Sequence, residues 1–227
     1  MPILKGKVGR ENLSDRVYSI IRSALMDGQF ETGQRLKISE ISNELGVSIT
    51  PVREAIFRLV SEEALEMKAA TAVHVPTRTS SDLRQIKAIR LFLEGMAAEA
   101  AAQKISQKAL DHLTSLQTAF LDVMVVDVKK ASELNRKFHF ALAEASEMTV
   151  VMHGIETMWL MLGPTLNDFH RIMQNERKFS GTHKHEAVLE ALRNKDGEAA
   201  KCAIQEDIEW GDVVISWVEE REHAEAN

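Results

Sequence analysis

The sequence is poor in cysteine, glycine and proline. It has one cysteine, Cys202, with 11 glycines and 4 prolines among 227 residues. A single cysteine cannot form an internal disulfide, and this predicts a reducing, cytoplasmic compartment. The shortage of glycine and proline, together with abundant Ala, Leu, Glu and Lys, favours a mainly helical protein.

Long apolar runs are also missing, so we expect no membrane-spanning segment, and the first residues lack the apolar core of a signal peptide. Hydrophobic residues make up 44% and charged residues 27%, a balance typical of a globular protein rather than a disordered one. The net charge of -6 argues against a protein that binds nucleic acid through its whole surface. Residues 1–78 are nonetheless near neutral, with 11 basic against 10 acidic side chains, so a local DNA-binding patch remains compatible with this charge.

The segment from Ile38 to Val60 has the pattern of two short helices joined by a tight turn. Apolar residues recur every three or four positions on both sides of Gly46, and glycine suits the left-handed residue that ends a helix. Ser48 and Thr50 are candidate N-caps of the second helix. Such a helix-turn-helix can place its second helix in the major groove, where Arg53 is expected to contact a guanine edge or a phosphate. The spacing alone fits equally well two packed helices that never meet DNA.

The flanking segments complete a small N-terminal domain. An apolar periodicity predicts a helix over residues 13–25, and two short strands are predicted at residues 64–68 and 72–76. The polar segment 77–81 is the expected domain boundary, with Ser80 as a candidate N-cap of the next helix. We therefore predict a winged helix-turn-helix domain over residues 1–78.

Residues 79–227 are predicted to form an all-helical antiparallel bundle, because long amphipathic segments follow one another with short links. The expected helices are residues 82–104, 107–123, 129–146, 149–162 with an extension past Pro164, 182–194 and 198–220.

Five polar residues of this bundle fall on helix sides that are otherwise apolar: Arg90, Asn135, His139, His185 and Asp207. An isolated polar group in a core costs several kcal/mol unless it has a partner. Two histidines, an aspartate and an asparagine form an N/O ligand set suited to a divalent transition metal. Zinc is the first expectation, with nickel or manganese as alternatives, and Arg90 offers a planar guanidinium for a ligand carboxylate.

Each of these residues also has a simpler interpretation. His139 alone would more often be a hydrogen-bonded core histidine than a metal ligand. Arg90 and Glu94 are four residues apart and could form an ordinary surface ion pair. His183 could replace His185 as a ligand, since the two flank Lys184.

The run LGVSITPVREAIFRLVSEEAL (residues 45–65) resembles the winged helix-turn-helix signature of the GntR family of bacterial regulators, and residues 17–36 match as well. The resemblance implies that DNA is contacted by residues of the turn, the second helix and the wing, namely Arg35, Ser48, Thr50, Arg53 and Thr71. The sequence departs from the family at Ile49, where arginine is usual, and at the wing tip, where Thr71 and Ala72 replace arginine and glycine. One lost base contact removes about 1–3 kcal/mol of discrimination, so we expect an unusual or relaxed operator.

The second domain is similar to the FCD effector domain of the FadR-like branch of this family. The resemblance is carried by Arg90–Leu91 with Glu94, by NRKFHFAL (residues 135–142) and by HEAVLEAL (residues 185–192). It implies a metal held at Asn135, His139, His185 and Asp207, with asparagine in place of the usual aspartate and aspartate in place of a histidine. It also implies a small organic acid on the metal, neutralised by Arg90, and a homodimer that reads a palindromic operator.

The sequence therefore predicts a DNA-binding transcriptional regulator, most often a repressor in this family, that responds to a carboxylate-bearing effector. One alternative is a ligand-binding dimer whose operator specificity is weakened or lost, as Ile49 and Ala72 would allow. The other is a metal-dependent hydrolase in the helical domain, against which stands the lack of an HExxH motif and of an evident general base.

Overall fold

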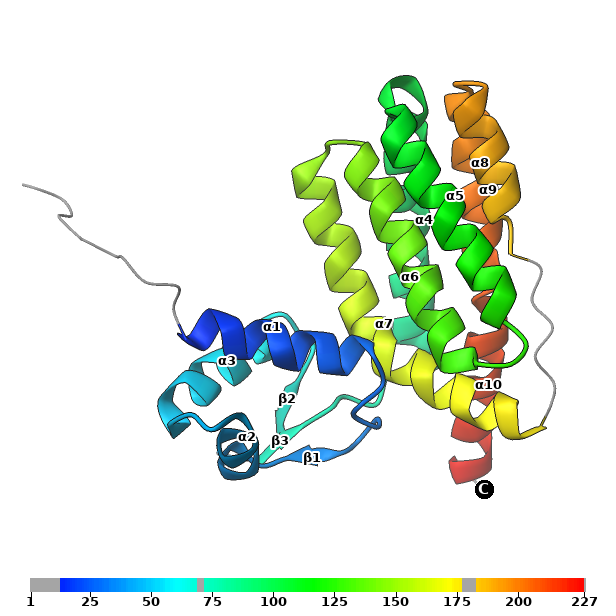
Figure 1. Cartoon of the computed structure of the whole chain (residues 1–227). Helices are drawn as coiled ribbons and strands as arrows, with labels where there is room; N and C mark the ends of the chain where they lie inside the picture. Colours follow the sequence, from blue (N-terminus) through cyan, green and yellow to red (C-terminus); the bar gives the residue numbers. More distant parts are fainter. Residues whose placement is uncertain (1–12, 69–71, 177–182, 227) are drawn as a thin grey trace, which may run out of the picture.

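The computed structural model describes residues 13–68, 72–176 and 183–226. A small N-terminal domain of three helices and a three-stranded sheet lies beside the lower part of a taller helical bundle (Figure 1). The expected fold class, a winged helix-turn-helix followed by an all-helical domain, is confirmed.

The N-terminal domain contains α1 (Leu13–Met26), α2 (Ile38–Leu45) and α3 (Ile49–Ser61). Its sheet has the order β1-β3-β2 and is antiparallel throughout, with β1 (Arg35–Leu36) and β2 (Glu66–Lys68) on either side of β3 (Ala72–His74). The two predicted strands are present but shorter than expected. The two-residue β1 was not predicted, because so short a strand gives no alternation of apolar and polar residues to read.

The turn between α2 and α3 forms for the reason that the sequence indicates. Gly46 has φ 64°, and its N–H and that of Val47 bond to the last carbonyls of α2. Ser48 occupies the N-cap position of α3, although its side chain makes no capping hydrogen bond. The two helices are held by the core of the domain, to which α1, α3 and β3 contribute fully buried residues: Val17, Ile21, Leu25, Val52, Ile56, Leu59 and Val73.

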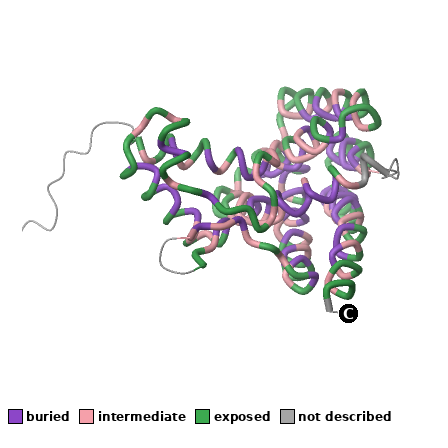
Figure 2. Tube along the Cα trace, turned by 90° about the horizontal axis from the view of Figure 1, so that it is seen from below, coloured by how far each residue is buried: buried purple, intermediate pink, exposed green. Residues whose placement is uncertain are grey.

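The bundle is built from seven helices in the described part of the chain: α4 (Ser80–Lys104), α5 (Gln107–Val123), α6 (Val128–Ala145), α7 (Thr149–Glu176), α8 (His185–Arg193), α9 (Gly197–Glu209) and α10 (Asp212–Ala226). Buried residues follow the inward sides of these helices (Figure 2). α4 packs along α9, and α6 packs between α5 and α7, so the inner sides of α4, α6 and α9 face a shared core.

Two predicted helix limits need correction, and one predicted extension is confirmed. Thr79, rather than Ser80, is the N-cap of α4: its side chain accepts from the Asp82 N–H in a capping box, and Ser80 is buried as the first helical residue. The extension past Pro164 is confirmed, because α7 continues through this residue to residue 176 as one helix. The helix expected over residues 198–220 is two helices, separated at Trp210 and Gly211.

The two domains touch along α1 and α7. Gly163 brings α7 close to α1, since a Cβ at this position would lie 3.1 Å from the Cα of Met26. Arg136 of α6 forms an ion pair with Asp27, and Thr32 donates to Asp168 of α7 through both its N–H (3.0 Å) and its hydroxyl (2.7 Å). The N-terminal domain is thus tied to the same helices that form the interior of the bundle.

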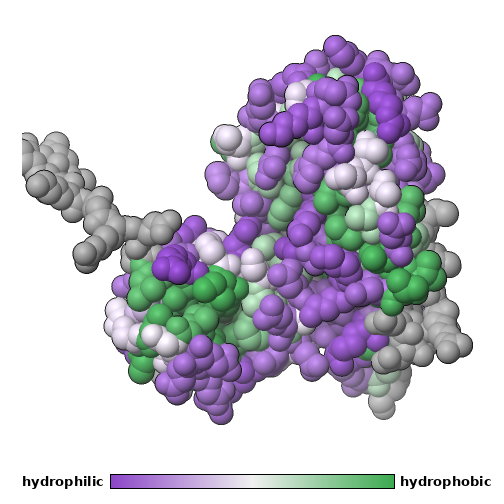
Figure 3. Space-filling model, viewed as in Figure 1, coloured by the Kyte–Doolittle hydropathy of each residue, from purple (hydrophilic) through white to green (hydrophobic). Residues whose placement is uncertain are grey.

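The outward sides of the bundle helices are largely hydrophilic in the view of Figure 3, apart from hydrophobic patches on the N-terminal domain and low on the bundle. Among the described residues, every helix is too short or too polar to cross a membrane.

Candidate functional site

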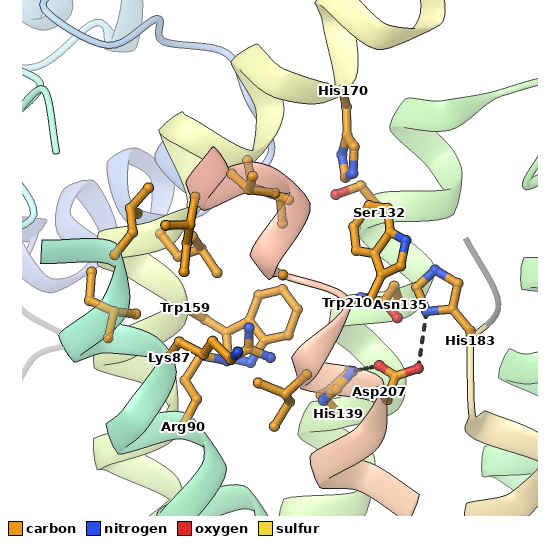
Figure 4. A pocket seen from close by; sticks show the side chains of 18 of the residues that line it. Lys87, Arg90, Ser132, Asn135, His139, Trp159, His170, His183, Asp207 and Trp210 are labelled. Atoms are coloured by element: carbon orange, nitrogen blue, oxygen red, sulfur yellow. Dashed lines mark hydrogen bonds and ion pairs between the residues drawn. The ribbon is translucent and has the colours of Figure 1, made fainter. Parts of the chain in front are cut away.

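The inward polar residues of the bundle meet in its interior (Figure 4). His139 of α6, His185 at the start of α8 and Asp207 near the end of α9 are all buried, and each offers one ligand atom within 4.8 Å of the others. Asn135 lies one turn before His139 on α6 and lines the same cavity. The structure therefore brings together the four residues that the sequence placed in one ligand set.

His139 is held between two carboxylates. Its Nδ1 lies 2.5 Å from Glu94 Oε2, and its Nε2 lies 3.2 Å from Asp207 Oδ2. Burial alone lowers the pKa of His139, but the charges and hydrogen bonds of Glu94 and Asp207 outweigh this effect and raise it. A carboxylate at each ring nitrogen thus favours the charged form of His139.

Glu94 of α4 is the centre of a second set of contacts, with residues of α4, α6 and α7. Its carboxylate accepts from Arg90 Nε at 2.6 Å and from Trp159 Nε1 at 3.2 Å, besides contacting His139. Burial alone would raise the pKa of Glu94, but the charges of Arg90 and His139 hold it at about 2. The surface ion pair considered for Arg90 and Glu94 is wrong, because the Glu94 side chain is only 3% exposed.

His185 is the neutral histidine of the site. Its Nδ1 lies 2.7 Å from Gln117 Oε1, and because that oxygen only accepts, Nδ1 carries the proton. Burial lowers the pKa of His185 to about 3, so the other ring nitrogen, Nε2, keeps a free lone pair. That nitrogen is buried without a hydrogen-bond partner and lies 3.8 Å from Asp207 Oδ2, and Asn135 Oδ1 is likewise buried without a partner.

Asp207 joins these groups to the start of α8. Its Oδ1 accepts from the Lys184 N–H at 2.8 Å and lies 3.2 Å from His183 Nδ1. Although burial alone raises the pKa of Asp207, the hydrogen bonds from His139 and His183 hold it well below its ordinary value. His183, considered as a replacement for His185, contacts Asp207 from the other side and also lines the cavity.

A cavity of about 60 Å³ opens beside this cluster, between α4, α6, α7, α9 and α10. Arg90 lies on its wall, with the guanidinium 4.1 Å from the centre of the Trp159 ring, and its only hydrogen bond to a described residue uses Nε. Lys87 also lines the cavity, but it is paired with Glu209 and Asp212. The two terminal nitrogens of Arg90 are therefore the uncommitted cationic group of this wall.

The sequence indicated the inward polar residues Asn135, His139, His185 and Asp207 but missed the residues that orient the two histidines. Glu94 and Gln117 hold the Nδ1 atoms of the two histidines, and Trp159 covers Arg90. The four-residue spacing of Arg90 and Glu94 was visible in the sequence, but it does not distinguish a buried pair from an exposed one. The sequence around Gln117 shows no spacing that would indicate its contact with His185.

The described residues expected at DNA are exposed on two elements of the N-terminal domain. Ser48, Thr50 and Arg53 are exposed at the start of α3, and Arg35 is exposed on β1. The guanidinium groups of Arg35 and Arg53 make no ion pair with any described residue, whereas Arg58 is bound to Asp15 and Glu62 and lies over Tyr18. Thr71, at the tip of the wing, lies outside the described residues.

Comparison with known proteins agrees with this architecture. Residues 13–75 match the family described as bacterial regulatory proteins, gntR family, and residues 85–209 match the FCD domain. The chain belongs to the gntR family and carries an FCD domain. This gntR-family chain is 30% identical to the HTH-type transcriptional regulator McbR of Escherichia coli K12 over 202 residues, which cover 88% of this chain and 91% of McbR.

The solved structure of McbR and one further relative help to place this gntR-family protein. The solved structure of E. coli McbR/YncC superposes with a TM-score of 0.81 at 28% identity, covering 92% of this chain and 99% of that one. The gluconate operon transcriptional repressor of Bacillus subtilis is 26% identical over 189 residues, which cover 80% of this chain and 76% of the repressor. The protein is thus a DNA-binding transcriptional regulator and not an enzyme, and the hydrolase interpretation is set aside.

Proposed function

We propose that the protein is a homodimeric transcriptional repressor whose operator binding is controlled by a small organic acid, bound at a divalent metal in the helical domain. The observation that carries this proposal is the convergence of His139, His185 and Asp207 in a buried cluster beside a cavity. Two relatives named as transcriptional repressors, those of the gluconate operon, support the assignment as a repressor.

The residues present fit a metal ion. Asn135 Oδ1 and His185 Nε2 are buried acceptors without a hydrogen-bond partner, a costly state that a cation would relieve. Glu94 and Gln117 fix the Nδ1 atoms of the two histidines and so direct Nε2 of each ring toward Asp207, as the outer partners of metal-binding histidines do. Two imidazoles, a carboxylate and an amide oxygen favour zinc, with nickel or manganese as alternatives.

The charges of the site also favour an anionic effector. Without a metal, the two carboxylates Glu94 and Asp207 are balanced by Arg90 and the His139 imidazolium. A divalent ion that replaces the proton on His139 Nε2 leaves one positive charge in excess. A single carboxylate would restore neutrality, with the terminal nitrogens of Arg90 as its partner; the metal, when bound, supplies the second point of attachment.

DNA binding is assigned to the exposed start of α3 and to β1. Arg53 and Arg35 are unpaired among the described residues, and Ser48 and Thr50 lie beside Arg53, so these four, with Thr71, are the proposed contacts. A dimer would present two copies of α3 to a palindromic operator. The second candidate, a regulator with relaxed specificity, is favoured by Ile49, an apolar residue 47% exposed at the start of the recognition helix.

The first test is a native mass spectrum of the purified full chain, followed by DNA binding. We expect a dimer carrying one metal per chain, and loss of that metal after treatment with a chelator. A duplex selected by the protein from random DNA should bind much more tightly than unselected duplex at the same salt concentration. A chain that takes up no added zinc, nickel or manganese would refute the metal site, and equal affinity for both duplexes would favour relaxed specificity.

A further inference from the structure

The cavity beside the metal cluster has two unlike halves. One half carries polar groups: those around Asp207, His139 and Arg90, together with Ser132 and His170 (Figure 4). The other half is formed by aliphatic side chains from three helices: Leu83 and Ile86 of α4, Leu162 and Leu166 of α7, and Val214 and Ile215 of α10. These six side chains offer neither a hydrogen-bond donor nor an acceptor.

This aliphatic half exists because of the break between α9 and α10. Gly211 ends the tight turn after α9, so that α10 restarts at Asp212 and directs Val214 and Ile215 toward α4 and α7. Asp207 precedes this turn, and Val214 and Ile215 follow it, so the polar and aliphatic parts of the cavity meet at the turn. A ligand held by Arg90 and a metal at Asp207 therefore has Val214 and Ile215 within the same cavity to pack against.

An aliphatic wall discriminates against hydroxylated ligands. Burying a hydroxyl group without a partner weakens binding about 5- to 150-fold, and a polyhydroxy acid would bring several such groups. A methylene group in the same place gains about fourfold in affinity from its removal from water. The cavity measures about 60 Å³, which favours a short ligand.

We propose that the effector is a short monocarboxylic acid with an unsubstituted hydrocarbon body, and not a sugar acid or another polyhydroxy acid. Its carboxylate lies at Arg90 and the metal cluster, and its hydrocarbon body lies against Leu83, Ile86, Val214 and Ile215. This inference rests on the proposed function, because it assumes that the cluster and Arg90 bind a carboxylate.

The test compares acids of matched size by isothermal titration calorimetry on the full chain loaded with zinc. Pentanoate and 4-hydroxybutanoate differ only in a terminal methyl or hydroxyl group, far from the carboxylate. We expect pentanoate to bind at least about tenfold more tightly, and affinity to rise about fourfold for each methylene from propanoate to pentanoate. Pentan-1-ol, which lacks the carboxylate, should bind far more weakly than pentanoate.

A variant of the wall provides the structural control. Val214→Thr keeps the size of the side chain but puts a hydroxyl group on the aliphatic wall. This substitution should lower the affinity for pentanoate about three- to tenfold. The matched substitution Val218→Thr, one turn further along α10 and buried away from this cavity, should change the affinity by less than about twofold. Pentanoate affinity that is insensitive to Val214→Thr would place the ligand elsewhere.

The outcomes separate this inference from the proposed function. If zinc binds and 4-hydroxybutanoate is preferred to pentanoate, or chain length has no effect, the hydrocarbon ligand is refuted while the carboxylate site stands. If zinc binds but no acid does, both the effector class and the acid-controlled function fail. If the chain takes up no zinc, the metal-centred part of the proposed function fails. The same acid series on the metal-free chain then tests whether the aliphatic wall binds the hydrocarbon part of the ligand.

Discussion

Arg53 differs from its neighbour Arg58 in having no partner among the described residues. Arg58 is bound to Asp15 and Glu62 and covers Tyr18, which makes it part of the packing between α1 and α3. Arg53, one turn earlier, is exposed and free to meet a base edge or a phosphate. Two arginines of one helix thus have separate roles, one in stability and one in DNA binding.

Arg53→Ala should therefore weaken binding to a selected operator duplex by about 1–3 kcal/mol, with an unchanged melting temperature. Fluorescence anisotropy at fixed salt measures the affinity. Arg193→Ala, an equal change in charge at an exposed position of α8, serves as the control and should leave the affinity within about twofold. Equal losses in the two variants would mean that Arg53 acts only through the net charge.

Gln117 acts on the proposed metal through His185. Its Oε1 accepts from Nδ1 and so fixes both the tautomer and the orientation of the ring. Gln117→Leu removes this acceptor and should lower zinc affinity about 10- to 100-fold, whereas Gln117→Glu keeps an acceptor oxygen and should retain most of it. Competition with a chromophoric chelator measures the affinity. Identical zinc affinity in the leucine variant would show that His185 is not a ligand.

At the scale of the element, α8 begins with a histidine that folding keeps neutral. Burial lowers the pKa of His185 from its ordinary 6.5 to about 3, so the unfolded chain binds a proton in this range that the folded chain does not. Stability is therefore lost as the pH falls from 6.5 toward 3. His170, whose pKa burial lowers to about 4, contributes in the same direction.

For the metal-free protein, the His185 contribution lowers the melting temperature at pH 5 by about 4 to 8 °C relative to pH 7, and the raised pKa of His139 offsets part of this decrease. His185→Gln cannot take up the proton and should show a smaller decrease over the same interval. His112→Gln, at an exposed position of α5, should behave like the parent chain. Thermal unfolding followed by circular dichroism in chelator-treated samples gives the comparison, and a decrease unaffected by His185→Gln would contradict this assignment.

The elements also show where the sequence was sufficient. The helix-turn-helix and most bundle helices followed from apolar periodicity, and the inward sides of Arg90, His139, His185 and Asp207 followed from the same pattern. The break at Trp210 and Gly211 did not, because apolar residues continue at helical spacing on both sides of it. The partnership of Glu94 with His139 joins residues 45 positions apart in sequence, and no local spacing reports such a contact.

In the whole molecule, one helix, α6, carries two of the proposed metal ligands and also contacts the DNA-binding domain. Asn135 and His139 face the cavity from α6, and Arg136, between them in sequence, reaches out of the bundle to Asp27 at the end of α1. The adjoining contact runs from Thr32 to Asp168 on α7, one residue from Phe169 in the core. A change in the position of α6 or α7 on ligand binding would therefore reach the DNA-binding domain directly.

Arg136→Met removes the ion pair with Asp27 but keeps the length of the side chain, so it should reduce the change in operator affinity that metal and acid together produce. We expect operator affinity without ligands and zinc affinity each to stay within about threefold, while the ligand-induced change falls by about fivefold or more. Lys137→Met is the matched control, because Lys137 is adjacent on α6 but pairs only within that helix, with Glu133. Anisotropy titrations of operator duplex, with and without zinc and pentanoate, measure all three quantities. Because Arg90 on α4 and the proposed metal ligands on α6 are untouched, a full ligand response in Arg136→Met would show that the two domains communicate through another contact, with Thr32 and Asp168 the next to be changed.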